Sequence, residues 1–255
     1  MLDNPKQVKQ EIIEWIRNYF ETNGKNCYAV IGISGGKDSS IAAALCAEAL
    51  GKDKVVGVLM PNGVQPDIED SKEVVEALGI PYLVINIHDS VTGLSNEINK
   101  QLSASQCIDS NELSRDAIIN MPPRIRMSTL YAIGQCLPGG ARVVNTCNRS
   151  EDYIGYSTKY GDSAGDFSPL SNLVVEEVMQ IGQLCDIPKQ LVTKTPSDGL
   201  SGMSDEEKIG FTYATLDHYI LTGECEDPQI KEKIDRMHRN NLHKLQLMPA
   251  FTLKR

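Results

Sequence analysis

Hydrophobic and polar positions along the first half of the chain alternate between a helical and an extended pattern. Apolar residues recur with helical spacing from Val8 to Tyr19, after an Asn4-Pro5 pair typical of a helix start. Beyond this first helix, short apolar runs predict strands, and helical patterns ending at glycines lie between them. The strands are predicted at 27–33, 55–60 and 81–87, and the helices at 40–50 and 67–78. Alternation of this kind predicts right-handed crossovers in a parallel sheet.

The second half of the chain is predicted to be mainly helical. A long helical stretch at 88–137 leads to a fourth strand at 141–146. The segment at 192–207 is rich in Gly, Pro, Ser and Asp, which predicts a loop. Further helices are predicted at 149–157, 174–185, 206–221 and 228–241. No linker separates a second unit, so we expect one α/β domain over residues 1–255.

Composition and charge narrow the classes of function. The net charge of −9 argues against a nucleic-acid partner, because such binders need a clustered positive surface. The first residues have neither a basic start nor an apolar core, and nowhere do about eighteen apolar residues run together. A cytoplasmic protein without a membrane span is therefore expected. The seven cysteines are scattered without a C-x-x-C pair, which indicates neither a disulfide framework nor a zinc site.

The sequence SGGKDS at 34–39 follows the first predicted strand and enters a helix. Its N–H groups, its hydroxyls and the helix N-terminus suit a phosphate, although a tight turn that uses glycine only for its shape is the alternative. A P-loop would need glycine in place of Ile31, and the dinucleotide pattern would need glycine in place of Ser34. A carboxylate in an anion cradle repels phosphate unless a divalent cation lies between them, so Asp38 predicts magnesium.

The glycine loop resembles the pyrophosphate loop of the N-type ATP pyrophosphatases. A second segment, VVNTCNRSEDYIGYSTKYGDSAGDFSPL at 143–170, is more specific and resembles a segment of the ammonia-dependent NAD synthetases. The stretches PPRIRMSTLYA, KTPSDGL and HKLQ extend the similarity over nearly the whole chain. The resemblance implies a doubly wound parallel sheet with helices on both faces, in a homodimer. It also implies an enzyme that adenylates deamido-NAD with ATP, releases pyrophosphate, and then uses ammonia to give NAD and AMP.

The resemblance also implies roles for individual residues. Asp38 and Glu151 are expected to bind Mg²⁺, and together with Lys194 they are the expected catalytic residues. The expected ATP contacts are Gly32, Ile33, Ser34, Gly35, Gly36, Lys37, Asp38, Ser39, Thr146, Lys194 and Thr212. The expected contacts to deamido-NAD are Arg124, Lys159, Asp166, His243 and Lys244. Since no glutaminase domain is found, free ammonia or a separate subunit is expected to supply the nitrogen.

Several of these residues have simpler interpretations. Glu151 opens a predicted helix, where an acidic residue is favourable in any case. Arg124 fits a solvated helix face, and His243 lies in a polar tail. Asn145 stands where the family usually has glycine, so its side chain either crowds the phosphate pocket or points away. Cys147 near the site raises a sulfur-transfer hypothesis, but no second cysteine is suitably spaced to resolve a persulfide.

Two alternatives to the synthetase hypothesis remain open. One is another adenylating member of the superfamily, such as a tRNA-modifying enzyme or the ATPase half of a GMP synthetase. The acidic composition and the absence of an extra domain argue against it. The other is a non-catalytic nucleotide-binding protein on the same scaffold, which would not need Asp38, Glu151 and Lys194 together.

Overall fold

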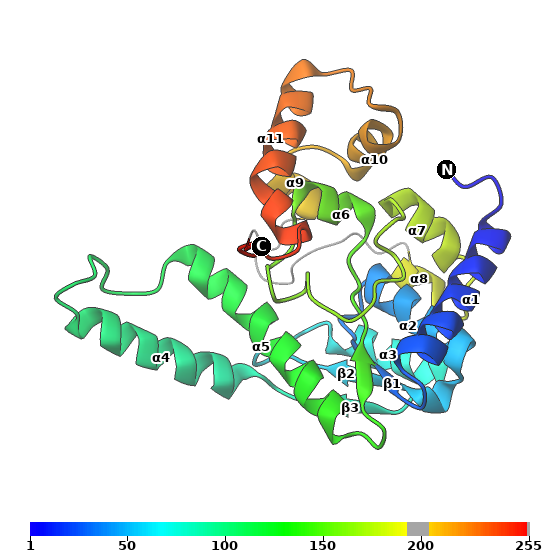
Figure 1. Ribbon diagram of the computed structural model, residues 1–255, viewed down its shortest axis with the longest axis horizontal. Coiled ribbons are helices and arrows are strands. Elements are labelled where there is room, and N and C mark those ends of the chain that lie inside the picture. The colour runs from blue at the N-terminus through cyan, green and yellow to red at the C-terminus, as the bar shows by residue number, and fades with distance from the viewer. Residues whose placement is uncertain (193–203, 254–255) are drawn as a thin grey trace.

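A computed structural model describes residues 1–192 and 204–253 of the chain (Figure 1). Within these residues, four parallel strands form one sheet in the order β3-β2-β1-β4. The strands are β1 (Tyr28–Gly32), β2 (Val55–Leu59), β3 (Tyr82–Val84) and β4 (Ala141–Val143). The chain winds outward from β1 through β2 to β3 and then returns to β4 on the other side of β1. This reversal of direction confirms the predicted doubly wound sheet.

The helices occur where helical patterns are predicted, with some differences. They are α1 (Pro5–Asn23), α2 (Lys37–Leu50), η1 (Lys52–Lys54), α3 (Ile68–Leu78), α4 (His88–Ala104), α5 (Arg115–Cys136), α6 (Arg149–Ile154), α7 (Val175–Gly182), α8 (Lys189–Val192), α9 (Asp205–Ile209), α10 (Tyr213–Thr222) and α11 (Pro228–Leu245). The predicted helix at 206–221 is two helices, because Gly210 adopts a φ of 77° and ends α9. The fourth strand ends at Val143 instead of residue 146, and Val144 forms an isolated bridge with Phe167.

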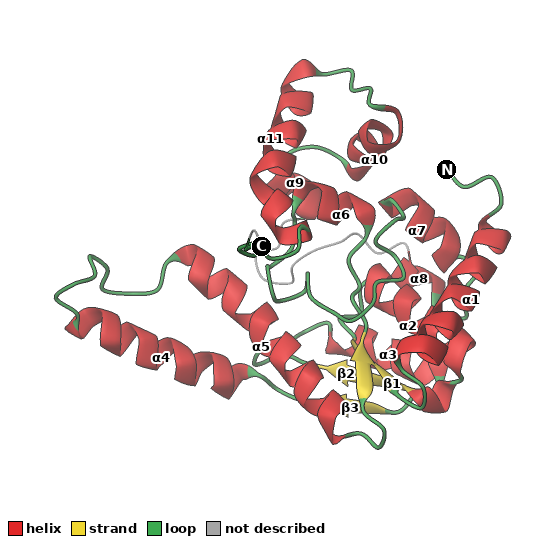
Figure 2. Cartoon of the chain, in the orientation of Figure 1, coloured by secondary structure: helices red, strands yellow, loops and turns green. Residues whose placement is uncertain are grey.

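Helices cover both faces of the sheet, as β1 illustrates. Ala29 and Ile31 belong to an apolar cluster that includes residues of α1, α2, α3, α7 and α8. Val30, between them in the sequence, belongs to a second cluster with α5, because alternate residues of a strand point to opposite faces. A third cluster joins α6, α7, α9, α10 and α11, most of which form the upper part of the molecule in Figure 2. The site described below lies between the sheet and this third cluster.

The helical pair α4 and α5 projects from the body of the molecule (Figure 1). The whole of α4 lies within the described residues, and it buries none of its side chains. Large apolar side chains are exposed along β3, α4 and α5: Tyr82, Leu83, Val84, Leu94, Ile118 and Ile119. In the described ranges, every helix is too short or too polar to cross a bilayer. These six exposed side chains, called the apolar face below, are candidates for contact with another protein chain.

Candidate active site

The glycine loop connects β1 to α2 and holds itself in shape through its two serines. The Ser34 and Ser39 hydroxyls lie 3.1 Å apart, and the Gly36 N–H donates to Ser34 Oγ at 3.2 Å. Gly35 has a φ of +78°, and a Cβ there would lie 2.8 Å from the Asp70 Cβ on α3. Position 35 thus requires glycine, both for its backbone conformation and for its close packing against α3. Gly36 has a φ of −81°, which other residues can also adopt.

The N-terminus of α2 is positioned to receive an anion. Gly36 is its N-cap residue and has no side chain that could cap the first turn. The first N–H groups of a helix lack partners within the helix, and together with the helix dipole they favour a negative group. Ile33, just before the loop, donates its N–H to Val58 O at 3.0 Å, which fixes the loop to the end of β2. The loop therefore combines a rigid backbone with an uncapped helix N-terminus.

Asp38 is held by partners from two different parts of the chain. Its Oδ2 accepts from Lys37 Nζ at 2.7 Å, and its Oδ1 accepts from Asn148 Nδ2 at 3.1 Å. Asn148 is fully buried, and it follows β4, the strand next to β1. Asp38 and Asn148 thus meet at the carboxyl ends of neighbouring strands, where the order of the sheet reverses and where ligands of open α/β sheets bind.

Glu151 lies on the first turn of α6, where it forms a reciprocal cap with Asn148. The Asn148 Oδ1 accepts from the Glu151 N–H at 3.0 Å, and Glu151 Oε2 accepts from the Asn148 N–H at 3.3 Å. Glu151 therefore has the structural role that its position at a helix start suggests. Burial, and then the charge of Asp38, raise the pKa of the Glu151 carboxyl to about 8, with Lys37 acting against this rise. The two carboxylates are thus close enough to repel each other, and a cation between them would relieve the repulsion.

The donor set at this position fits Mg²⁺ bound together with a nucleotide. Among the described residues, no group of three or more His, Cys, Asp or Glu side chains could hold a metal ion without other ligands. Mg²⁺ commonly takes one or two carboxylates and completes its shell with waters and substrate phosphates. Asp38 and Glu151 would supply the carboxylates, and a phosphate at the N-terminus of α2 would lie beside them.

Tyr213 faces the same site from the start of α10, and sequence reasoning did not identify it. Its side chain is 4% exposed, and its hydroxyl has no hydrogen-bond partner among the described residues. Burial raises the pKa of this hydroxyl, and the charges of Glu151, Asp205 and Asp38 raise it further. Tyr213 therefore stays protonated beside the two carboxylates, and its hydroxyl could donate to a ligand bound there.

Thr212, an expected ATP contact, is the N-cap residue of the same helix. Its Oγ1 accepts from the Thr215 N–H at 3.1 Å, and its side chain is exposed. Lys194, the third expected catalytic residue, lies outside the described residues. Thr146 is half-buried on the segment between β4 and α6. The ATP-binding roles of these three residues stay predictions.

Four of the five positions expected to hold the dinucleotide come together at the turn that follows α6. Arg124 Nε donates to Lys159 O at 3.2 Å, and Lys159 Nζ donates to His243 O at 3.0 Å. Lys244 Nζ donates to Gly155 O at 2.6 Å and to the carbonyl of residue 157 at 2.7 Å. These side chains come from α5, the turn and the end of α11, so they form a basic cluster from three distant parts of the chain. Arg124 is exposed, as a solvated helix face predicts, and it also contacts this turn.

Asp166, the fifth of these positions, makes different contacts. Its Oδ2 accepts from the Val143 N–H at 2.7 Å, and its Oδ1 accepts from the Tyr131 hydroxyl at 3.3 Å. Its carbonyl accepts from the Tyr19 hydroxyl at 3.0 Å. The structure therefore places Asp166 beside β4 and α1, where it ties strand and helix together, and does not bring it into contact with the basic cluster.

Asn145 points away from the glycine loop. Its side-chain amide donates to the carbonyls of Asp162 and Ala164 at 2.8 and 3.1 Å, and its Oδ1 accepts from the Cys147 N–H at 3.0 Å. Gly165 allows this arrangement, because a Cβ there would lie 2.8 Å from the Asn145 Cβ. The asparagine thus braces the 162–168 turn and does not crowd the phosphate pocket.

Cys147 is buried beside the site and is not poised as a nucleophile. Burial raises the pKa of its thiol well above the ordinary value, and the carboxylates of Glu151, Asp152 and Asp162 contribute to the increase. A thiol in this state has little thiolate at neutral pH, and thiolate is the reactive form. This environment argues against sulfur transfer through Cys147.

Asp217 is a buried carboxylate next to α6, the helix that carries Glu151. The side chain is 3% exposed, and its Oδ1 accepts from the Ser150 hydroxyl at 2.5 Å. Its Oδ2 accepts from the Glu176 N–H at 2.9 Å, at the start of α7. Asp217 therefore joins α10, α6 and α7 and fixes the helix that carries Glu151.

Replacing Asp217 by alanine is expected to destabilise the protein. The Ser150 hydroxyl and the Glu176 N–H would lose a buried acceptor, which costs about 2–4 kcal/mol in the free energy of unfolding. Urea unfolding monitored by circular dichroism measures this change. Asp217→Asn retains one carbonyl acceptor and should have a smaller effect. Equal midpoints for the alanine variant and the unmodified protein would show that the network contributes nothing.

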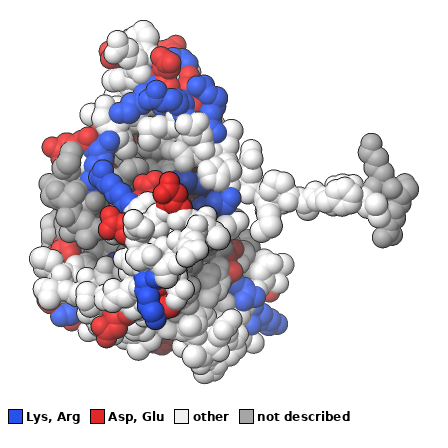
Figure 3. Space-filling view, turned by 90° about the vertical axis from the view of Figure 1, so that its left-hand side faces the viewer, with Lys and Arg blue, Asp and Glu red and all other residues white. Residues whose placement is uncertain are grey.

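Basic side chains gather above the site although the chain is acidic as a whole. Figure 3 shows Lys and Arg side chains in the upper part of one face of the molecule, with acidic side chains among them. Helix α11, in that upper part, carries Lys231, Lys233, Arg236, Arg239 and Lys244. A local group of cations of this size suits a small phosphorylated ligand better than a long nucleic-acid backbone.

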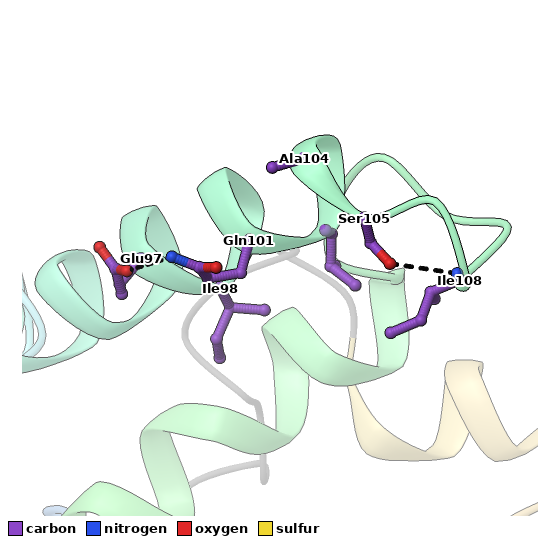
Figure 4. A pocket seen from close by; sticks show the side chains of 7 residues that line it. Glu97, Ile98, Gln101, Ala104, Ser105 and Ile108 are labelled. Carbon is purple, nitrogen blue, oxygen red and sulfur yellow. Dashed lines mark hydrogen bonds between the residues drawn. The ribbon is translucent and has the colours of Figure 1, made fainter.

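A hollow at the outer end of α4 is a separate feature. Its lining side chains are Glu97, Ile98, Gln101, Leu102, Ala104, Ser105 and Ile108 (Figure 4). The Ser105 hydroxyl accepts from the Ile108 N–H at 3.2 Å, which closes the turn at its edge. The lining has one acidic group and no basic group. It therefore has little that would bind an anionic nucleotide.

The fold and the site together define a class of protein. A doubly wound sheet carries a glycine loop and an uncapped helix at its switch point, with two carboxylates beside them. This is the arrangement of a nucleotide-binding α/β protein. The family model described as NAD synthase matches residues 8–253, so the chain belongs to the NAD synthase family.

Similar proteins with known names support this family membership. An NH3-dependent NAD⁺ synthetase from Pyrococcus furiosus is 35% identical over 258 residues, covering 96% of this chain and 93% of the relative. Among solved structures, an NMN synthetase from Francisella tularensis has a TM-score of 0.86 at 29% identity, covering 98% of this chain and 99% of its own. An NH3-dependent NAD synthetase from Campylobacter jejuni shares the fold, with a TM-score of 0.77 at 22% identity over 98% of this chain and 100% of its own. The resemblance inferred from the sequence is thus confirmed.

Proposed function

We propose that the chain is an ammonia-dependent NAD synthetase, which adenylates the nicotinate carboxylate of deamido-NAD with ATP and then amidates it. The observation that carries the proposal is that Asn148 bonds to both Asp38 and Glu151 and so holds the two carboxylates near the end of the glycine loop. A protein that only bound the nucleotide would need the phosphate cradle but not this carboxylate pair. Family membership and the names of the relatives support the same reaction.

The reaction has two steps, and the residues named here serve the first. A carboxylate is a poor electrophile, so its oxygen first attacks the α-phosphate of ATP and pyrophosphate leaves. The N–H groups of the first turn of α2 and the serine hydroxyls of the loop would bind the phosphates on which charge develops. The Tyr213 hydroxyl would donate to an oxygen of the same group. Ammonia then attacks the carbonyl carbon of the adenylate, and AMP leaves as NAD forms.

A divalent cation and the basic cluster complete the proposal. Mg²⁺, bound by Asp38 and Glu151 with ATP, would supply positive charge to the leaving pyrophosphate. Arg124, Lys159 and Lys244 would turn from the backbone carbonyls that they now contact to the phosphates and carboxylate of the dinucleotide. We also expect the enzyme to work in the cytoplasm.

A product assay tests this function. The purified protein with ATP, Mg²⁺, deamido-NAD and ammonium is expected to form NAD and AMP in equal amounts. ADP in place of AMP would exclude the mechanism. Replacing ammonium by glutamine should stop product formation, because the chain is expected to have no glutaminase domain. Product from glutamine at the same rate would contradict that expectation.

Nicotinate mononucleotide is a second candidate substrate. The NMN synthetase from Francisella tularensis superposes with a higher TM-score than the Campylobacter jejuni enzyme. The amidated acid would then be nicotinate mononucleotide, which carries the same carboxylate without the adenylate half. Equal concentrations of the two acids in one reaction, with both products separated by chromatography, decide between them. Predominant NMN would replace deamido-NAD in the proposal and leave the adenylation chemistry unchanged.

The proposed enzyme is a homodimer, and the apolar face of β3, α4 and α5 is its proposed interface. Ile118 on α5 is 57% exposed, and its neighbour Ile119 is 49% exposed. A second copy of the chain would bury these side chains, as the projecting form of the helical pair suggests. Helix α1 also exposes a large apolar side chain, Trp15.

Ile118→Glu is expected to weaken the dimer, because a charge would enter an apolar interface. A loss of roughly 100-fold in the association constant is expected. Size-exclusion chromatography with light scattering over a dilution series measures it. Leu221→Glu, which places the same change on α10 at a side chain that is 45% exposed, serves as the matched control. A dimer of unchanged strength in the Ile118 variant would place the interface elsewhere.

A further inference from the structure

Lys37 is unusual because it is a buried cation in a site where a metal cation is expected. Its side chain is 3% exposed, and lysine is almost never buried to this degree unless it is paired. Its ammonium lies 2.7 Å from Asp38 Oδ2 and 5.9 Å from the centre of the Tyr213 ring. The ammonium is therefore paired with Asp38 and lies near the ring of Tyr213.

The charge of Lys37 is balanced by a direct contact. Its ammonium forms a salt bridge with Asp38, and the other oxygen of that carboxylate accepts from Asn148 Nδ2 at 3.1 Å. Lys37 and Asn148 thus take up both oxygens of an expected metal ligand, and Lys37 supplies the positive charge that a bound cation would supply.

We propose that Lys37 is a resident counter-ion that competes with the divalent cation for Asp38 and blocks metal binding until a nucleotide arrives. The proposal rests on the metal-binding role of Asp38 and Glu151 in the proposed function. The same carboxylate oxygen cannot receive both cations at close range, because the two repel each other at low dielectric. When triphosphate binds at the N-terminus of α2, the ammonium of Lys37 turns from Asp38 to a phosphate oxygen. Metal and nucleotide therefore enter together.

Mn²⁺ serves as the probe, because its binding to the nucleotide-free protein can be measured by electron paramagnetic resonance without turnover. Lys37→Gln removes the competing charge and is expected to bind Mn²⁺ roughly tenfold or more tightly than the unmodified chain. Lys37→Arg keeps the charge and should bind Mn²⁺ as weakly as the unmodified chain. With a non-hydrolysable ATP analogue present, the advantage of Lys37→Gln should disappear, because the displaced ammonium then contributes to phosphate binding.

Two controls locate the effect. Lys37→Gln combined with Asp38→Asn should lose the tight Mn²⁺ site, which shows that the gain occurs at this carboxylate pair. Lys37→Met is a second neutral variant and should bind Mn²⁺ as tightly as Lys37→Gln. Circular dichroism and urea unfolding show whether each variant is folded. The proposal is overturned if neither neutral variant binds Mn²⁺ more tightly than the unmodified chain, or if Lys37→Arg binds it as tightly as Lys37→Gln. Failure of the proposed function would appear elsewhere, as missing NAD and AMP in the product assay.

Discussion

Asp38→Asn is expected to reduce turnover by about a thousandfold or more, because a neutral amide is a weak ligand for Mg²⁺. Loss of the charge stabilisation at the leaving pyrophosphate would raise the barrier by several kcal/mol. The variant should remain folded, since its side-chain oxygen can still accept from Asn148 Nδ2. Formation of AMP and NAD at saturating Mg²⁺ measures the effect.

The buried Lys37 requires a control for this experiment. Asp38→Asn removes the nearest counter-charge of the ammonium, and an unpaired buried charge is itself destabilising. The double variant Lys37→Gln with Asp38→Asn removes both charges. If metal binding is the reason for the loss, the double variant stays as inactive as Asp38→Asn. Recovery of turnover in the double variant would show that the unpaired lysine caused the loss.

The parallel sheet was predictable because its signals are local. Each strand is a short apolar run, and each helix that follows has its own start and stop residues, such as Gly79, which ends α3 in the left-handed conformation. The exact limits of the strands were not predictable, since pairing decides them. The predicted third strand at 81–87 is reduced to β3, although Ile85 still donates to Leu59 O at 2.8 Å beyond its end.

Errors in the helical region have local physical causes. The helix predicted at 206–221 ignored Gly210, whose φ of 77° allows α9 to end and lets Thr212 cap α10. Helix α8, at the edge of the predicted loop, is only Lys189–Val192, too short to show helical periodicity. By contrast, the helical prediction over α5 is confirmed, although Pro122 and Pro123 lie inside this helix and proline disfavours helix interiors.

Only part of the candidate site was predictable, because local sequence patterns mark only the glycine loop and the helix start at Asn148 and Glu151. The glycine loop is a local pattern, and the N-x-x-E spacing of Asn148 and Glu151 could have been read as a capping box. The contact of Asn148 with Asp38 joins residues 110 positions apart, and periodicity carries no information about it. Tyr213 looks like an ordinary core position and Asp217 like an exposed polar one, so only the fold shows that both are buried and which groups they face.

Glu151→Gln is expected to lower turnover by about a hundredfold to a thousandfold and to leave stability nearly unchanged. Glutamine at this position can still accept from the Asn148 N–H, because a capping box uses either side chain. The charge needed for Mg²⁺ is lost, and with it part of the stabilisation of the leaving pyrophosphate. Turnover at saturating Mg²⁺ and the urea midpoint, measured on the same sample, separate the two roles.

Glu151→Ala completes this comparison, because it removes the cap as well as the charge. It should lose activity to the same extent as Glu151→Gln and lose about 1 kcal/mol of stability in addition, the usual contribution of a helix cap. A Glu151→Gln variant that kept a near-normal rate at saturating Mg²⁺ would limit Glu151 to capping α6, and Asp38 would be the sole carboxylate ligand among the residues proposed here. Equal stability of the two variants would instead show that the reciprocal cap is not what holds α6 against the glycine loop.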